Sequence, residues 1–179
     1  MPASTVLESQ AADTALVRSA RAGDRAAFGE LYERYRRMVH GILLAHVPYS
    51  EAEDLMQTVF VRAMQRLPHL REPEAFGAWL AAITRNLACD HHRRSKNPIE
   101  ITEMNCGRAH ADESEMALDA VRRLPEAYRE TLMLRLVEGM TGPEIAARTN
   151  LTPDSVRVNL CRGMKLLRAQ LGGKTDHAR

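Results

Sequence analysis

The sequence is poor in aromatic residues and in runs that resemble β-strands. Phe, Trp and Tyr together make up 4% of the 179 residues, whereas Ala, Leu, Met and Arg are plentiful. The abundant residues favour helix, and no segment shows the pattern of a strand. We therefore expect an all-α protein.

Membrane, secretion and disulfide features are also missing. No apolar run approaches the length needed to span a bilayer, and the N-terminus lacks the basic and then apolar layout of a signal peptide. The three cysteines, Cys89, Cys106 and Cys161, are widely spaced and odd in number, which makes a poor disulfide framework. We expect a cytoplasmic chain with free thiols and no membrane insertion.

Signatures of catalysis are absent as well. The sequence has no Gly-rich phosphate loop, no Ser-His-Asp layout and no paired catalytic carboxylates. Cys89, His91 and His92 are close together, but a structural zinc site uses four ligands, and the nearest further donors are Cys106 and His110. Two interpretations stay open. The group binds zinc or senses the redox state, or it consists of ordinary surface histidines and a small buried cysteine. We expect no enzyme activity, no cofactor and no metal.

What the sequence does contain is a pair of helices joined by a short turn near the C-terminus. Thr141 and Glu144 have the spacing of a capping box, which starts the first helix. Asn150 tolerates the left-handed conformation that ends a helix, and Thr152-Pro153 starts the second one. This pattern predicts a helix-turn-helix.

The second of these helices is expected to have a basic outer face. From Arg148 to the C-terminus, seven Arg or Lys against two Asp give a net charge of +5. The face opposite its apolar stripe carries Ser155, Val158, Asn159 and Arg162. Most side chains suited to base edges or phosphates lie in its first three turns, the part of a recognition helix that enters the major groove. We expect DNA binding; an ordinary helical hairpin with a solvated basic face is the alternative.

Acidic residues are concentrated near the middle of the N-terminal part. Asp24 is expected to cap a long helix that ends before Pro48, and Ser50 with Glu53 has the spacing of a second capping box. The helix opened there carries three carboxylates in its first turns. Compensation of the helix dipole, worth about 0.3–1 kcal/mol for each acid, is one explanation, and a binding surface is the other.

A further helix is predicted from Glu74 to about Ser95. Trp79 lies on its apolar stripe and is expected to be a core residue rather than a stacking platform. The far end of the helix is polar and basic, which is typical either of a solvated surface or of a nucleic-acid track. Asn97-Pro98 then breaks the helix. We expect a flexible linker over residues 97–112 that separates a helical domain, residues 12–96, from a four-helix domain, residues 113–172.

The order of these motifs resembles the extracytoplasmic-function (ECF) class of bacterial sigma factors, in the sigma-70 family. Four stretches carry the resemblance. They are GDRAAFGELYERY from Gly23, EAEDLMQTVFVRA from Glu51, FGAWLAAITRNLACDHHRR from Phe76, and LPEAYRETLMLRLVEGMTGPEIAARTNLTPDSVRVNLCRGMKLLR from Leu124. Together they span most of the chain. The resemblance implies a transcription initiation factor with sigma region 2 in the first domain and region 4 in the second.

The resemblance also implies three sets of binding residues. Contacts with the clamp helices of the largest subunit of RNA polymerase core would come from Glu53, Asp54 and Gln57, with Leu55 and Phe60 partly supporting the fold. Melting and reading of the −10 promoter element would use Leu70, Arg85, Asn86, Arg93, Arg94 and Lys96. Reading of the −35 element would use Ser155, Arg157, Asn159, Arg162 and Lys165. Relatives often carry Ser and Arg at the positions of Val158 and Asn159, so the bases that are read stay open.

Further partners follow from the same resemblance. They are promoter DNA, the flap of the polymerase, and an anti-sigma factor that holds members of the class inactive. The alternative function is a stand-alone helix-turn-helix regulator with an N-terminal sensing or dimerisation module. The acidic helix followed by a basic helix argues against this alternative, because a repressor requires neither.

Overall fold

The protein is all-helical in the residues that its computed structural model describes, 3–95 and 113–172. These two segments, called the N-terminal half and the C-terminal half below, hold eight α-helices and two short 3₁₀ turns. The expectation of an all-α protein is confirmed. The linker predicted over 97–112 lies outside the described residues, as do Lys96, Cys106 and His110.

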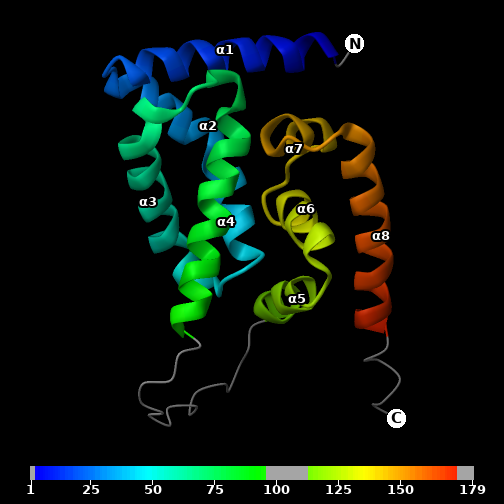
Figure 1. The fold of residues 1–179 in the computed structure, drawn as a ribbon. Helices are drawn as coiled ribbons and strands as arrows, with labels where there is room; N and C mark the ends of the chain where they lie inside the picture. The colour runs from blue at the N-terminus through cyan, green and yellow to red at the C-terminus, as the bar shows by residue number, and fades with distance from the viewer. Residues whose placement is uncertain (1–2, 96–112, 173–179) are drawn as a thin grey trace.

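The N-terminal half is a bundle of three helices with a fourth across one end (Figure 1). Its elements are α1 (Ala3–Arg21), α2 (Arg25–Leu44), α3 (Tyr49–Arg66), the turns η1 (Leu67–His69) and η2 (Pro73–Ala75), and α4 (Phe76–Ser95). Fully buried side chains from α2 and α4, among them Leu31, Met38 and Leu80, make up much of its core. Buried apolar stripes at helical spacing explain why these segments fold as helices against one another.

The predicted caps in this half are partly confirmed. Asp24 caps α2, and its Oδ1 accepts hydrogen bonds from the backbone amides of Ala26 and Ala27 at 2.9 and 3.2 Å. The capping box predicted for Ser50 and Glu53 is wrong. Since α3 begins at Tyr49, with Pro48 at the N-cap and no side-chain cap, Ser50 is already inside the first turn.

The C-terminal half contains α5 (Glu113–Arg122), α6 (Glu126–Leu136), α7 (Gly142–Thr149) and α8 (Pro153–Gly172). The capping box at the start of α7 is confirmed, since the Glu144 carboxylate accepts from the Thr141 amide at 2.7 Å and the Thr141 hydroxyl accepts from the Glu144 amide. Asn150 has the expected left-handed conformation, with φ of 60°. Helices α7 and α8 are therefore the predicted helix-turn-helix.

A glycine lets α8 lie close to α6. A Cβ atom on Gly163 would be 2.9 Å from Cδ1 of Leu132, which is fully buried, and 3.1 Å from Cβ of Tyr128. Real Cβ atoms essentially never make contacts as short as the first of these. The long recognition helix is thus anchored by the close approach of its own backbone to α6.

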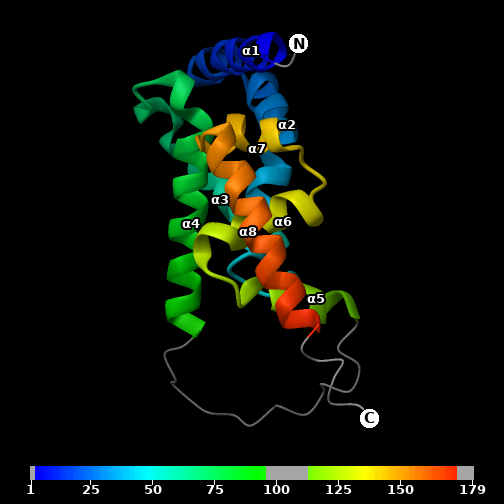
Figure 2. The same cartoon turned by 90° about the vertical axis from the view of Figure 1, so that its right-hand side faces the viewer.

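The two halves are packed against each other. Helices α6 and α7 pack against α2 and α4, and α8 covers the outer side of α6 and α7 (Figure 1 and Figure 2). The buried apolar residues of both halves form one continuous cluster. A Cβ on Gly41 of α2 would lie 2.7 Å from Cδ2 of Leu134 in α6. The guanidinium of Arg148 in α7 lies 4.8 Å from the ring centre of Tyr35. The packing of the two halves against each other was not predicted from the sequence.

Candidate nucleic-acid and partner interfaces

The acidic surface predicted for polymerase binding lies on α3. Glu53, Asp54 and Gln57 are exposed, and Leu55 is half-buried beneath them. Phe60 is 5% exposed and its ring centre lies 4.5 Å from that of Tyr32. Phe60 therefore holds α3 on α2, while the three polar side chains are free to meet a partner.

Of the six residues predicted for the −10 element, the five that the structure describes are not gathered on one face. Leu70 follows η1 and is 7% exposed, so it belongs to the core. Asn86, Arg93 and Arg94 are exposed along the second half of α4. Arg85 instead points toward the C-terminal half and forms an ion pair there. Lys96 lies outside the described residues.

Trp79 is half-buried and packs against the core, as the sequence analysis expected. Its ring centre lies 5.7 Å from that of Phe76, and Phe76 in turn meets Tyr35 edge to face at 5.0 Å. These three rings join α2 to α4.

The recognition helix presents part of the set predicted for the −35 element. Arg162 and Lys165 are exposed, and Arg157 is exposed with an ion pair of 3.2 Å to Asp154. Both side chains of that pair are more than three quarters exposed, so it contributes little to stability. These three cations form the basic outer face of α8.

Ser155 and Asn159 have other partners. The Ser155 amide donates to Oγ1 of Thr152 at 3.1 Å, and the two hydroxyls lie 2.7 Å apart, which makes Ser155 part of the N-terminal cap of α8. The helical pattern placed Asn159 on the outer face, but it is half-buried and its Nδ2 donates to Oγ1 of Thr131 at 3.4 Å. Asn159 thus faces α6.

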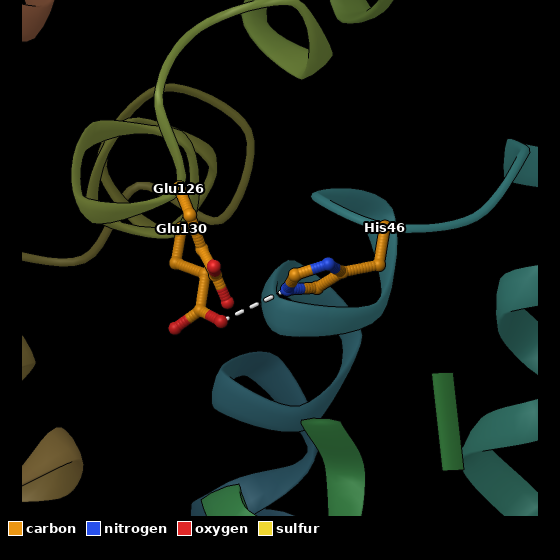
Figure 3. Close-up of side chains that lie close together, drawn as sticks. All are labelled: His46, Glu126 and Glu130. Carbon is orange, nitrogen blue, oxygen red and sulfur yellow. Dashed lines mark hydrogen bonds and ion pairs between the residues drawn. The ribbon is translucent and has the colours of Figure 1, made fainter. Parts of the chain in front are cut away.

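Charged groups from both halves meet in a cluster that the sequence analysis missed. The carboxylate of Glu130 in α6 accepts three hydrogen bonds from Nε and Nη2 of Arg85 in α4, at 2.8–3.0 Å. Its Oε1 also lies 2.9 Å from Nε2 of His46, just after α2. Figure 3 shows His46 facing Glu130 and the neighbouring Glu126. These side chains link the two halves.

The electrostatics of Glu130 reflect this setting. Burial alone raises the pKa of this carboxyl, but the hydrogen bonds from His46 and Arg85 and the charge of Arg85 outweigh it, so the pKa is lowered. The pKa of Arg85 is raised, chiefly by its hydrogen bonds to Glu130. Glu130 is therefore ionised and holds Arg85 firmly.

A second pair joins the halves near the acidic surface of α3. Nδ1 of His40 lies 2.6 Å from Oε1 of Glu138, and the backbone oxygen of Glu138 accepts from Arg37. Glu53 lines the same cavity, of about 150 Å³, as His40 and Glu138. The C-terminal half thus reaches the edge of the surface predicted to bind polymerase. No sequence signal could have identified these pairs, because their members are about 100 positions apart.

None of the helices in the described segments is long and apolar enough to cross a lipid bilayer.

Two segments of the chain match known families. Residues 31–97 match Sigma-70 region 2, and residues 114–167 match Sigma-70, region 4. The chain is 32% identical over 162 residues to the RNA polymerase sigma factor CarQ of Myxococcus xanthus, covering 85% of this chain and 93% of CarQ. It is 31% identical over 166 residues to the ECF RNA polymerase sigma factor BldN of Streptomyces coelicolor; 85% of this chain matches, but it spans only 63% of the length of BldN.

A solved structure has a similar fold. CnrH, determined in complex with the cytosolic domain of CnrY, superimposes with a TM-score of 0.61 at 25% sequence identity. The similarity covers 90% of this chain and 98% of the CnrH chain.

Proposed function

Because the chain belongs to the sigma-70 family of RNA polymerase sigma factors, in its ECF class, we propose that it directs RNA polymerase core to specific promoters. The observation that carries the proposal is the placement of two exposed charged surfaces. An acidic one on α3 falls within the region 2 match, and a basic one on α8 falls within the region 4 match. A sigma factor is an initiation factor and not an enzyme.

The two halves have different roles in this proposal. Residues 12–96 bind the clamp helices of the polymerase and open the −10 element, and residues 113–172 read the −35 element as duplex and contact the flap. The exposed Asn86, Arg93 and Arg94 suit an opened strand, since a polar and basic track can hold its backbone and a base edge. In this proposal the protein acts in the cytoplasm, together with the polymerase.

An anti-sigma factor is the further partner in this proposal. CnrH was solved with a cytosolic protein domain bound, and the similarity to CnrH covers nearly all of this chain. This inhibitor would then cover the acidic surface of α3, which otherwise binds the polymerase, and the basic surface of α8, which otherwise binds promoter DNA.

Transcription in vitro with purified core polymerase and a promoter library tests the proposal. We expect transcripts from a defined promoter set only when the chain is added to core. The absence of a complex between the chain and core, without any inhibitor, would contradict it. Binding of the chain alone to an operator-like duplex would then favour the stand-alone regulator.

Charge reversal on the acidic surface should weaken the complex with core polymerase. Asp54→Lys replaces an exposed carboxylate of α3, so the helix should be retained while its attraction to a basic partner is lost. The measurement is the affinity for core in a binding titration, with helix content checked by circular dichroism. Glu33→Lys, the same reversal at an exposed site of α2, is the matched control and should bind as the natural chain does.

Removal of one recognition-helix cation should weaken promoter binding. Arg162→Ala is expected to reduce the affinity of the holoenzyme for a −35-dependent promoter by about 1–3 kcal/mol, as for a base-reading arginine. Arg168→Ala removes an exposed arginine further along α8 and should have a much smaller effect. Equal losses in both variants would show that α8 contributes charge and not base recognition.

A further inference from the structure

The contact between the halves contains a set of metal-ligand atoms. His46, Glu126 and Glu130 each offer one nitrogen or oxygen, and these three atoms lie within 4.8 Å of one another. Among the described residues no other group of three His, Cys, Asp or Glu side chains meets this condition. The set differs from the Cys89, His91 and His92 group that the sequence analysis considered.

The distances suit a small divalent ion. Zinc lies about 2.0–2.2 Å from imidazole nitrogen and carboxylate oxygen, so two ligands in a tetrahedral arrangement are about 3.3 Å apart. Nε2 of His46 and Oε1 of Glu130 are 2.9 Å apart and share a proton. An ion in place of this proton needs the two atoms to separate by only a few tenths of an ångström.

The surroundings supply support and access. Arg85 holds Glu130 through both carboxylate oxygens, as the hydrogen-bonded neighbours of metal ligands commonly do. The side chains of His46 and Glu130 are 18% and 13% exposed, whereas Glu126 is exposed and leaves a path from solvent. An adjoining cavity of about 450 Å³ is lined by His46 and Glu126 from the cluster and by Cys89 and His92 of α4.

The net charge around the three ligands does not by itself attract cations. Arg85 and Arg129 also line the cavity and offset the two carboxylates, so an ion must be held by bonds to its ligands more than by long-range attraction. One imidazole with two carboxylates suits zinc and neighbouring transition metals, whereas Mg²⁺ and Ca²⁺ prefer oxygen ligands alone.

We propose that His46, Glu126 and Glu130 bind one divalent transition-metal ion, with Zn²⁺ as the probe, and that this ion ties the two halves together. His46 comes from the N-terminal half and both carboxylates come from α6 of the C-terminal half. The ion also keeps Glu130 in place against Arg85. Binding therefore favours the packed arrangement of the chain.

Calorimetric titration of the full chain with Zn²⁺, without polymerase or DNA, tests the ligand set. We expect one ion per chain, no competition by Mg²⁺, and a loss of affinity of about tenfold or more in His46→Gln and in Glu126→Gln. His46→Gln keeps a hydrogen-bond donor for Glu130. His40→Gln alters the other His–Glu pair between the halves and should bind Zn²⁺ as the natural chain does.

Several results would overturn the proposal. They are no binding of Zn²⁺, unchanged affinity in His46→Gln and Glu126→Gln, or loss of binding in Cys89→Ser, which would assign the ion to the thiol. A Co²⁺ complex that shows a thiolate charge-transfer band would do the same. Thermal unfolding gives the second readout: saturating Zn²⁺ should raise the melting temperature of the natural chain but not of Glu126→Gln.

One consequence rests on the proposed function. If the halves must separate to uncover the edge of the α3 surface beside Glu138, saturating Zn²⁺ should weaken the complex of the natural chain with core polymerase and leave that of Glu126→Gln unaffected. An equal effect on both proteins would overturn this consequence. Since ion binding is measured on the chain alone, failure of the metal site and failure of the sigma function are distinguished.

Discussion

Leu132→Ala is expected to lower the free energy of unfolding by about 2–5 kcal/mol, the usual cost of removing a buried leucine side chain. Leu132 of α6 is fully buried, and its Cδ1 lies where a Cβ on Gly163 of α8 would be only 2.9 Å away. Truncation leaves a cavity at the point where the recognition helix approaches α6 most closely. Chemical denaturation followed by circular dichroism measures the loss.

A second leucine substitution, at an exposed site, distinguishes the loss of core packing from the loss of a leucine side chain as such. Leu166→Ala removes the same atoms from α8 itself, but Leu166 is 40% exposed, so a change of about 0.5 kcal/mol is expected. Binding to −35 duplex DNA should follow the same order, since α8 loses its support only in Leu132→Ala. Similar losses of stability in the two variants would mean that the contact between α6 and α8 is not what holds the recognition helix.

Local signals in the sequence predicted the helix-turn-helix well. The Thr141 and Glu144 capping box and the left-handed Asn150 depend on hydrogen bonds and backbone preferences within a few residues, which the sequence contains directly. The same reasoning failed at Ser50 and Glu53. There Pro48 occupies the N-cap without a side-chain hydrogen bond, so α3 begins two residues earlier than the polar pattern indicated.

The direction in which a side chain points from its helix was harder to predict than the position of the helix in the sequence. The periodicity of α8 placed Asn159 opposite the core stripe, yet it donates to the buried Thr131 of α6. A helical pattern locates the centre of the buried stripe, but the width of that stripe depends on how closely the neighbouring helix lies. Gly163 brings α6 near enough to cover residues at the stripe's edge.

The contact between the halves could not be predicted at all. The resemblance to ECF sigma factors assigned Arg85 to the −10 element, and its partner Glu130 is 45 residues away in the other half. Neither residue has a local pattern that marks the pair. In this arrangement the Arg85 side chain is 37% exposed and engaged, so its use on DNA requires that Glu130 release it.

Gly41→Gln is expected to separate the two halves. A Cβ at this position would lie 2.7 Å from Cδ2 of Leu134 and 3.0 Å from Cγ of Glu138, both in the C-terminal half. Leu134 is 1% exposed and belongs to the core shared by the two halves, so we expect the longer glutamine side chain to push α6 away from α2. Overpacking of this kind costs about 1–3 kcal/mol. Size-exclusion chromatography with light scattering should give a larger hydrodynamic radius at unchanged mass.

Gly29→Gln provides the control on the same helix. No atom lies within 4 Å of a Cβ at Gly29, so this change should stabilise α2 by about 0.5–1 kcal/mol without moving the halves. Separation in Gly41→Gln should also release Arg85 and uncover the edge of the α3 surface beside Glu138, so its affinity for core polymerase should exceed that of Gly29→Gln. If the two variants have the same radius and the same affinity, the packed arrangement does not restrain either surface, and Glu130 does not compete with DNA for Arg85.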